Sequence, residues 1–533
     1  MRVLISLLEA ILLITGAGSP EELGESEMER FEALAAHPVC INLSGTARMR
    51  SCGLFSEYQI ASLQDYIART GDILSVTELG TVPGFTPDLA QALSFFISLE
   101  SYSPAGKRNY KRVRQEAMVQ SIVKESGSSY AGKYHMGYGE RAEFYLSMRD
   151  KPVASVVIYG RRPWKAVLGD FNARFGQGLL VWSGFSLSGF SSASAFEKNA
   201  SGFSGTGSFT PFKRGVALDW SGRRFSFSSG LSADGFALGS ASWHGRSAEA
   251  GVNAFSQGGR NGISADWKAG FGHLALFGET AWAEGPAALA GLVWTPAYKT
   301  SAGVLARYYS PSYASEGAGA ARSGTKVRDE AGISAGIVWK WLDCTADMAV
   351  HPERLAMRRN NYQQFKFLMN ARPEFGWRGW TLSPALRWTE RMQVSPSGDA
   401  YKAVWRHDIR ADLKASRGPL QGCLRLNALQ NGDSRTGGLA YLELGYKTAS
   451  DSARFQASVY LRGTVCDIPD WASRIYSYER DLPGCFTVPA WYGKKKGLSL
   501  IAGLSYQGRR CRQRLYFRAS TNDIKLQYQI WIW

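Results

Sequence analysis

The feature that most constrains the fold is an alternation of apolar and polar residues with a period of two, repeated from residue 112 to the end of the 533-residue chain. In the run RFQASVYLR (454–462), Phe, Ala, Val and Leu occupy every second position, and polar residues or Tyr occupy the positions between them. The runs 402–414, 498–506 and 514–519 repeat this pattern. Because successive side chains of a β-strand point to opposite faces, each run is predicted to be a strand with one apolar and one polar face.

The length and polarity of these runs favour a membrane barrel over a soluble sandwich. The runs are about 9 to 13 residues long, as a tilted membrane-spanning strand requires, whereas strands of soluble sheets are usually about 5 to 6 residues long. Their polar faces carry Arg, Lys, Asp and Gln rather than a second apolar layer. The sequence therefore predicts an all-β transmembrane barrel over 112–533, with roughly 20 to 24 antiparallel strands.

The connections and the tryptophans fit this prediction. Short turn-like segments, such as 220–223 and 507–509, alternate with long polar segments at 184–212, 309–329 and 464–496. Short turns at one rim and long loops at the other are typical of membrane barrels, as are aromatic girdles at the two interfaces. The tryptophans expected near strand ends are Trp164, Trp182, Trp220, Trp294, Trp341, Trp388 and Trp405.

The last predicted strand, DIKLQYQIWIW (523–533), ends in an aromatic residue. This ending resembles the recognition signal that the outer-membrane assembly machinery reads. The resemblance implies that machinery as a partner, in addition to the outer-membrane lipid around the strands. Trp533 departs from the signal because it lies one position out of phase with the apolar face of its strand.

Residues 1–18 are predicted to be a signal peptide. Arg2 supplies a positive start, an apolar run follows at 3–14, and small residues occupy 15–19. The apolar run is shorter than the ~18 residues that a membrane helix needs, and no other stretch of the sequence approaches that length. Export without a second hydrophobic helix fits a location in the outer membrane.

Residues 19–100 are predicted to be a small all-α domain on the periplasmic side. A segment rich in Glu, Leu and Ala at 21–36 reads as an amphipathic helix. Two similar helix–turn–helix units follow at 41–71 and 72–99, each with a short polar helix, a tight turn and a second helix with apolar residues at helical spacing.

The turn of the second unit, VPGFT at 82–86, resembles the helix-hairpin-helix motif of competence-type DNA receptors and DNA-repair proteins. In that family a Gly–hydrophobic–Gly turn holds a DNA phosphate with backbone N–H groups at a helix start, and helix N-termini do bind anions. The resemblance implies phosphate contacts at Gly84, Phe85 and Thr86. Thr86 stands where the family has its second glycine.

In the first unit Phe55 and Ser56 occupy the corresponding turn, and neither glycine is present. A side chain at these positions hinders the close approach of a phosphate. Two interpretations therefore stay open: the hairpins bind duplex DNA without reading its sequence, or they serve in packing and in docking of periplasmic proteins.

A basic linker is expected at 101–111, where Lys107 and Arg108 are candidates for contact with DNA or lipid head groups. The whole chain carries 62 Lys and Arg against 45 Asp and Glu, a net charge of +17. Such a balance favours attraction to polyanions. The explanation we favour, because the basic residues are spread along the chain, is that they line a wide polar lumen and its loops.

Two further segments complete a resemblance to barrel proteins of the Bacteroidetes that begin with helix-hairpin-helix units. One is 168–179, with LGDF followed by RFGQGL; the other is 478–493, with YERD followed by VPAWYG. The match covers nearly the whole chain after the signal segment, but it implies no settled activity. Within the first segment, Asp170, Arg174 and Gln177 are expected to form a lumen salt-bridge network or to line a constriction.

No known catalytic or phosphate-binding motif appears in the sequence. The six histidines lack metal-ligand spacing, and the seven cysteines include no CxxC pair, although Cys466 and Cys485 are placed to close a loop by a disulfide. We therefore expect no catalytic residue, metal or cofactor. The sequence predicts a role in envelope transport or partner docking, with DNA binding or uptake at the cell envelope as the alternative.

Overall fold

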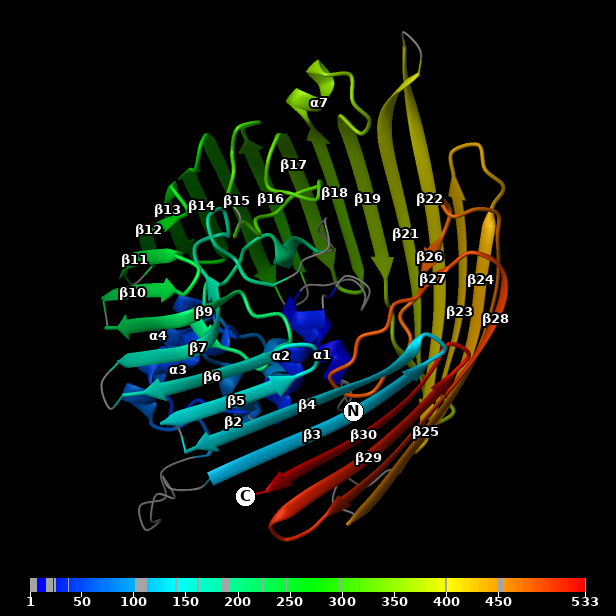
Figure 1. The fold of residues 1–533 in the computed structure, drawn as a ribbon, viewed down its shortest axis with the longest axis horizontal. Helices are drawn as coiled ribbons and strands as arrows, with labels where there is room; N and C mark the ends of the chain where they lie inside the picture. The colour runs from blue at the N-terminus through cyan, green and yellow to red at the C-terminus, as the bar shows by residue number, and fades with distance from the viewer. Residues whose placement is uncertain are drawn as a thin grey trace.

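The computed structural model describes residues 7–15, 23, 25–36, 38–100, 113–139, 141–160, 163–184, 192–222, 224–245, 247–297, 300–315, 317–397, 400–448 and 454–532. The alternating segments form 24 strands of one antiparallel sheet that closes into a barrel (Figure 1). Closure joins the first barrel strand to the last, with Gln115 opposite Ile532 and Lys124 opposite Asp523. The predicted fold class and the upper end of the predicted strand number are confirmed.

Each barrel strand pairs with its neighbours in the chain. The strands are β3 (Val113–Lys124), β4 (Gly127–Tyr138), β5 (Ala142–Met148), β6 (Pro152–Tyr159), β7 (Trp164–Arg174), β9 (Lys213–Ser221), β10 (Phe225–Ser232), β11 (Ala237–His244), β12 (Ala248–Gln257), β13 (Arg260–Phe271), β14 (Leu274–Trp282), β15 (Pro286–Ala297), β16 (Thr300–Tyr309), β17 (Glu330–Trp339), β18 (Leu342–Val350), β19 (Gln363–Ala371), β21 (Trp380–Ser397), β22 (Ala400–Arg417), β23 (Leu420–Asn431), β24 (Gly437–Lys447), β25 (Phe455–Ile468), β28 (Gly493–Gln507), β29 (Cys511–Ser520) and β30 (Asp523–Ile532).

The alternation sorts side chains between the outside and the lumen. On β23, Leu424 and Leu426 are 40% and 53% exposed, whereas Arg425 and Asn427 are each 8% exposed. Leu, Ile, Val and aromatic side chains are exposed in the same way around the sheet. An apolar outer belt and a polar interior are what a barrel in a lipid bilayer requires. Among the described residues, no helix is long and apolar enough to cross a membrane.

The two rims differ in their connections. The chain enters β3 and leaves β30 at the same rim, and most connections at this rim are short, as at 160–163 and 508–510. The opposite rim carries longer connections at 310–329, 351–362 and 469–492. This is the predicted arrangement of short turns and long loops.

Seven helices and several short strands complete the described part of the chain. The helices are α1 (Leu7–Thr15), α2 (Glu25–Ala36), α3 (Thr46–Cys52), α4 (Glu57–Thr70), α5 (Val76–Leu79), α6 (Pro87–Leu93) and α7 (Pro352–Ala356), with a 3₁₀ turn at Ala193–Ala195. The short strands β8 (Gly202–Gly205) and β20 (Phe375–Trp377) pair with β7 and β21 of the barrel sheet. Two separate small sheets are formed by β1 (Val39–Cys40) with β2 (Ile97–Ser98) and by β26 (Ile475–Tyr476) with β27 (Ala490–Trp491).

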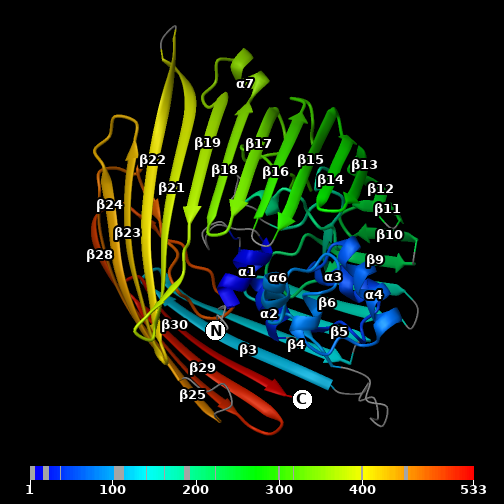
Figure 2. The ribbon, with the colours of Figure 1, turned by 180° about the vertical axis from the view of Figure 1, so that it is seen from behind.

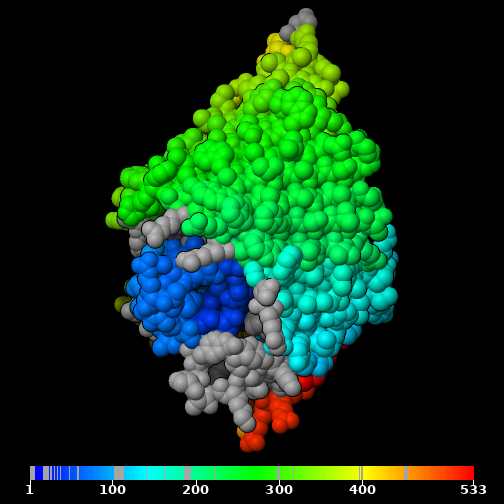
Figure 3. Space-filling model, turned by 90° about the vertical axis from the view of Figure 1, so that its left-hand side faces the viewer, coloured from blue at the N-terminus to red at the C-terminus, as the bar shows by residue number. Residues whose placement is uncertain are grey.

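Helices α1 to α6 pack on one hydrophobic core and form what we call the helical module. Within the two predicted units, α3 is followed by α4 and α5 by α6, each pair joined by a short connection. Their turns contact each other through an edge-to-face pair of Phe55 and Phe85, with ring centroids 6.1 Å apart. The module lies within the outline of the barrel in Figure 2, and its surface is visible beside the strands in Figure 3.

Helix α1 falls within the predicted signal peptide. Its Ala10 and Ile11 are buried, and α1 packs on α6 in the described structure. The signal peptide stays a prediction, which N-terminal sequencing of the purified protein tests directly.

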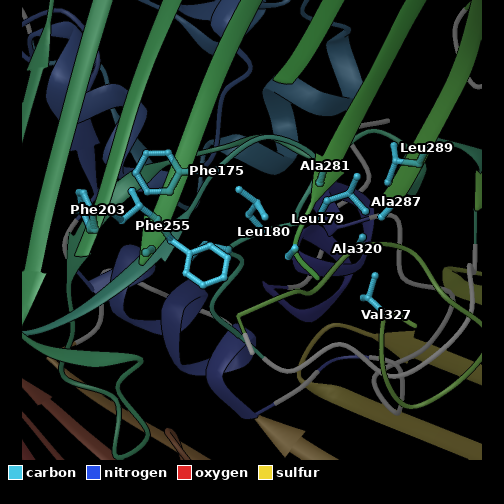
Figure 4. Close-up of a cluster of buried hydrophobic side chains, with 14 of the residues drawn as sticks. Phe175, Leu179, Leu180, Phe203, Phe255, Ala281, Ala287, Leu289, Ala320 and Val327 are labelled. Atoms are coloured by element: carbon cyan, nitrogen blue, oxygen red, sulfur yellow. The ribbon is translucent and has the colours of Figure 1, made fainter. Parts of the chain in front are cut away.

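Part of the chain between β7 and β9, together with the loop after β16, folds into the lumen. Phe175, Leu179 and Leu180 pack with Phe203 and with wall residues of β12 to β15 in a buried apolar cluster (Figure 4). A hydrogen bond from the Tyr313 hydroxyl to the Leu179 carbonyl, 2.7 Å long, ties the two inward segments together. The lumen beside β7–β17 is therefore filled by a dry core.

One sequence expectation is wrong in detail, and one disulfide that the sequence permitted is not formed. Trp182 is not in a girdle, because it lies on the inward segment with Arg174 and Lys198 over its ring. Cys466 and Cys485 do not form a disulfide; both are free thiols, and Cys485 accepts a hydrogen bond from Gln120 in the barrel wall.

The outer belt makes a testable prediction about stability. Leu426→Arg places a charge on the lipid face at the middle of β23, and we expect it to lower the free energy of unfolding by roughly 2–4 kcal/mol. Leu420→Arg on the same face, at the end of the same strand, should cost about 0–1 kcal/mol. Guanidinium unfolding of the protein folded in lipid vesicles measures both, and equal losses would contradict a membrane-spanning belt.

Candidate functional site in the barrel lumen

A continuous cavity of about 2120 Å³ runs between the helical module and the half of the barrel wall that the apolar core leaves uncovered. Its wall residues come from β19 to β30 and from β3 to β7. The module contributes Arg30, Arg48 and Phe95, and the loop before β28 contributes Arg474 and Arg480.

The lining of this cavity is strongly basic. Among the described residues, the carboxylates of this lining are Glu32, Glu116, Glu143 and Asp408. The cations of the same described lining are Arg30, Arg48, Arg114, Lys133, Arg174, Lys366, Arg387, Arg391, Arg406, Arg410, Lys447, Arg474, Arg480, Arg512 and Arg514. Cations thus outnumber carboxylates in the described lining, as expected if basic side chains line the lumen.

Five of these cations are in register on three neighbouring strands. In the first row, Lys366 on β19 is directly opposite Arg391 on β21, which is opposite Arg406 on β22. In the second row, Arg387 on β21 is opposite Arg410 on β22. We call these five residues the cation rows.

Amide side chains flank the second row. Asn370 on β19 is opposite Arg387, and Asn427 on β23 is opposite Arg410. Between the rows Thr389 is opposite Asp408, whose carboxylate accepts a 3.0 Å hydrogen bond from the Asn427 amide. Asp408 is the one carboxylate that these four strands contribute to the cavity lining.

The sequence indicated this site only partly. The polar face of the run 402–414, which contains Arg406 and Arg410, was recognisable from its period. That these cations stand opposite Arg387 and Arg391 depends on strand register, which the sequence did not reveal.

The helical module is held to the barrel by charged and polar contacts at the rim of short turns. The Arg48 guanidinium lies 2.5 Å from the Glu143 carboxylate on β5 and donates to the Tyr159 hydroxyl on β6. Arg50 donates to the Ser221 hydroxyl at the end of β9. Two neighbouring arginines of α3 are thus directed at the barrel wall.

Arg174 makes a second connection between barrel and module. Its guanidinium lies 2.6 Å from the Glu27 carboxylate on α2 and also donates to the Ser183 carbonyl. Burial raises the pKa of Glu27, but the charges of Arg30 and Arg174 outweigh burial and lower that pKa to about 2. We call the pairs Arg48–Glu143 and Arg174–Glu27 the docking pairs.

The other two residues predicted with Arg174 have different neighbours. Asp170 pairs with Arg214 on β9 at 2.8 Å and accepts from the Ala154 backbone N–H. Gln177 donates its backbone N–H to Glu279, and its side-chain amide binds the Lys198 backbone. Asp170 lies within the wall, and Gln177 holds the inward segment.

The charged residues of segment 478–481 pair with residues on three different strands of the barrel wall. Glu479 pairs with Arg518 on β29, Arg480 pairs with Glu443 on β24, and Asp481 pairs with Lys525 on β30. The loop before β28 is therefore fastened inside the lumen by three ion pairs, where it borders the cavity.

The hairpin residues lie at the turns of the module. Phe55 and Phe85 are buried, and the Ser56 and Thr86 hydroxyls cap their helices by accepting from the backbone N–H groups of Gln59 and Leu89. The Gln59 side chain also accepts from the Ser56 backbone N–H. Two backbone N–H groups at the first turn are therefore already hydrogen-bonded within the module.

In the second turn Gly84 is exposed, with φ of 89°, a backbone conformation that favours glycine. Lys107 and Arg108 lie outside the described residues.

The described residues include no group of three or more His, Cys, Asp or Glu side chains placed to hold a metal ion. The arrangement that the geometry does provide is electrostatic: a water-accessible cavity with a large excess of guanidinium and ammonium groups.

The sequence matches no protein-family description and no curated protein. Among solved structures it is similar to the P pilus usher (PapC) translocation pore, with 10% identity, 79% of this chain and 98% of that chain covered, and a TM-score of 0.34. It is also similar to OpdL of Pseudomonas aeruginosa, with 8% identity, 79% and 96% coverage and a TM-score of 0.29. These likenesses concern the barrel fold alone. Fold and lumen together define the class: a transmembrane β-barrel with a partly filled, basic lumen.

The ion pair between Glu27 and Arg174 predicts that the stability of the docked helical module depends on pH. The pKa of Glu27 in the folded chain is about 2, below the ordinary value of 4.5, so its stabilisation is fully present above pH 4.5 and is lost as pH falls toward 2. We expect the thermal unfolding midpoint of the helical circular-dichroism signal at 222 nm to fall through this range. Glu27→Gln should remove this part of the dependence; an unchanged profile in the variant would contradict the assignment.

Proposed function

We propose that the chain is an outer-membrane pore for solutes, with the helical module as a plug in its periplasmic mouth. The observation that carries this proposal is the cavity of about 2120 Å³ beside the module, which no described side chain fills. The short-turn rim, where the module docks, is the periplasmic rim in barrels of this kind. Outer-membrane lipid, the assembly machinery and periplasmic proteins are the proposed partners.

The contacts of the module fit a plug that can be displaced. Buried apolar side chains of the module form one cluster, and those of the barrel wall with its inward segments form two others. Among the described residues outside the module, Phe486 alone packs against the module's apolar cluster. Because polar interfaces between domains permit relative motion, the module can leave the mouth without opening a shared hydrophobic core.

The test is conductance of the full chain in planar bilayers. Replacing Arg48 and Arg174 by Gln removes both docking pairs, and the loss of charged hydrogen bonds should shift the docked module toward release by roughly tenfold or more. We expect the R48Q/R174Q double variant to conduct more than the unaltered chain. The control is Arg69→Gln, because Arg69 pairs with Asp65 on the exposed face of α4 and should leave conductance unchanged.

An absence of conductance in the unaltered chain and in R48Q/R174Q would overturn the pore. Equal conductance of the R48Q/R174Q and R69Q variants would support a pore but contradict the role of the module as a plug.

A second candidate is binding of duplex DNA by the hairpins without sequence preference. It is favoured by the exposed Gly84 turn above the buried Phe85. It is disfavoured by the capped first turn and by Arg48 and Arg50, which contact the barrel wall. Electrophoretic mobility shift of duplex DNA by the detergent-solubilised chain tests it; binding should weaken as salt rises, and no shift at low salt would end this candidate.

A further inference from the structure

The loop between β25 and β28 leaves the long-loop rim and folds back into the lumen as a hairpin. Its two arms pair first through β26 and β27. Further along, Glu479 pairs with Thr487, and a turn at 482–486 closes the hairpin. We call residues 475–491 the lumen hairpin and residues 482–486 its tip.

The lumen hairpin is fastened to the barrel wall along its length. Residues 479–481 form the three ion pairs with β24, β29 and β30 described above. At the tip, the Gln527 amide on β30 donates to the Pro483 carbonyl at 2.9 Å. The Gln120 amide on β3 donates to the Cys485 sulfur. The position of the tip is therefore set by the wall.

The tip also contacts the helical module. The Glu32 carboxylate on α2 accepts a hydrogen bond of 2.5 Å from the Gly484 backbone N–H. The Phe486 side chain packs on the module's apolar cluster, and its ring centroid lies 5.7 Å from that of Tyr478 in the same hairpin. A loop that begins at the long-loop rim thus reaches the module that is docked at the other rim.

We propose that the lumen hairpin is a latch that holds the helical module in the barrel mouth. A carboxylate that accepts from a backbone N–H forms a charge-assisted hydrogen bond, which is stronger than a neutral one. The Phe486 ring adds apolar contact at the same place. Departure of the module toward the periplasm must break both contacts in addition to the docking pairs.

The two sets of contacts indicate where the latch opens. The wall holds the hairpin through buried charges, because the side chains of Arg518 and Lys525 are 1% and 7% exposed. Breaking a buried ion pair is strongly unfavourable. The module is held by a hydrogen bond and an aromatic ring, so this junction separates first. The hairpin then stays on the wall, where Arg480, Gly484 and Phe486 border the cavity.

The latch depends on the proposed plug for its role, but its central contact is measurable without conduction. The first measurement is hydrogen–deuterium exchange of the detergent-solubilised full chain, followed by mass spectrometry of the peptide that contains the tip. In Glu32→Ala the Gly484 amide loses its acceptor, and we expect it to exchange about tenfold faster. The matched control is Asp65→Ala on the exposed face of α4, which should leave exchange at the tip unchanged.

The same measurement tests where the latch opens. In R48Q/R174Q, release of the module should also speed exchange at the tip. The Glu479 amide, which donates to the Thr487 carbonyl at 3.0 Å within the hairpin, should stay protected because the hairpin remains on the wall. Equal acceleration of both peptides would contradict a hairpin that stays behind.

The second measurement is conductance of the full chain in planar bilayers. The test variant is E32A/F486A, which removes both contacts of the tip with the module and should raise the open probability by about tenfold. The matched control is W471A, because Trp471 is an aromatic residue of the same loop that packs on Tyr492, with ring centroids 4.8 Å apart. A heat-dependent shift in electrophoretic mobility verifies that the barrel of each variant is folded.

The outcomes separate the latch from the pore. Unchanged exchange at the tip in E32A would overturn the latch. Equal conductance of E32A/F486A and W471A, with higher conductance of R48Q/R174Q, would also overturn the latch and keep the plug. Faster exchange at the tip in E32A without conductance in any variant would refute the pore and support the contact between hairpin and module.

Discussion

The hydrogen-bonded seam between β3 and β30 is the interaction on which the remaining structure depends. Within hydrocarbon every backbone N–H and C=O must be paired inside the protein, so an open sheet edge is not tolerated. The seam joins residues near 113 to residues near 532 and thus closes almost the whole described length of the chain after the module into one ring. Closure also creates the lumen, because each strand then has one side toward lipid and the other toward an enclosed space.

A ring of 24 strands encloses more space than wall side chains can fill. This chain fills its lumen unequally. Beside β7–β17, inward segments bring Leu179, Phe203 and their neighbours onto the wall and exclude water. Beside β19–β30 the filling is a loop fastened by Arg480 and its neighbours, and an open cavity remains. Because the apolar core covers the other part of the wall, the cations that line the cavity lie on the part of the wall that it leaves uncovered.

The sequence predicted what depends on local periodicity. The barrel strands follow from the alternation of apolar and polar residues, and the start of α4 follows from the capping residue Ser56. It failed where the outcome depends on pairs distant in the chain. Arg174 meets Glu27 across 147 residues, and Arg391 meets Arg406 through strand register. Trp182 shows the same limit: its local context fitted a girdle, but the inward turn of its segment places it in the lumen.

The docking pairs and the cavity are electrostatically connected. Arg30, Arg48 and Arg174 line the cavity and are also the arginines that Glu143 on the wall and Glu27 on the module engage. An anion in the cavity competes with these carboxylates for the same guanidinium groups. A ligand shifts an equilibrium only through a difference in affinity between two states, and here the difference has a definite origin: release of the module frees Arg174 from Glu27 and Arg48 from Glu143. In the proposed pore, an anion that competes for Arg48 and Arg174 would therefore favour release of the module, so that solute binding and opening of the mouth would be coupled.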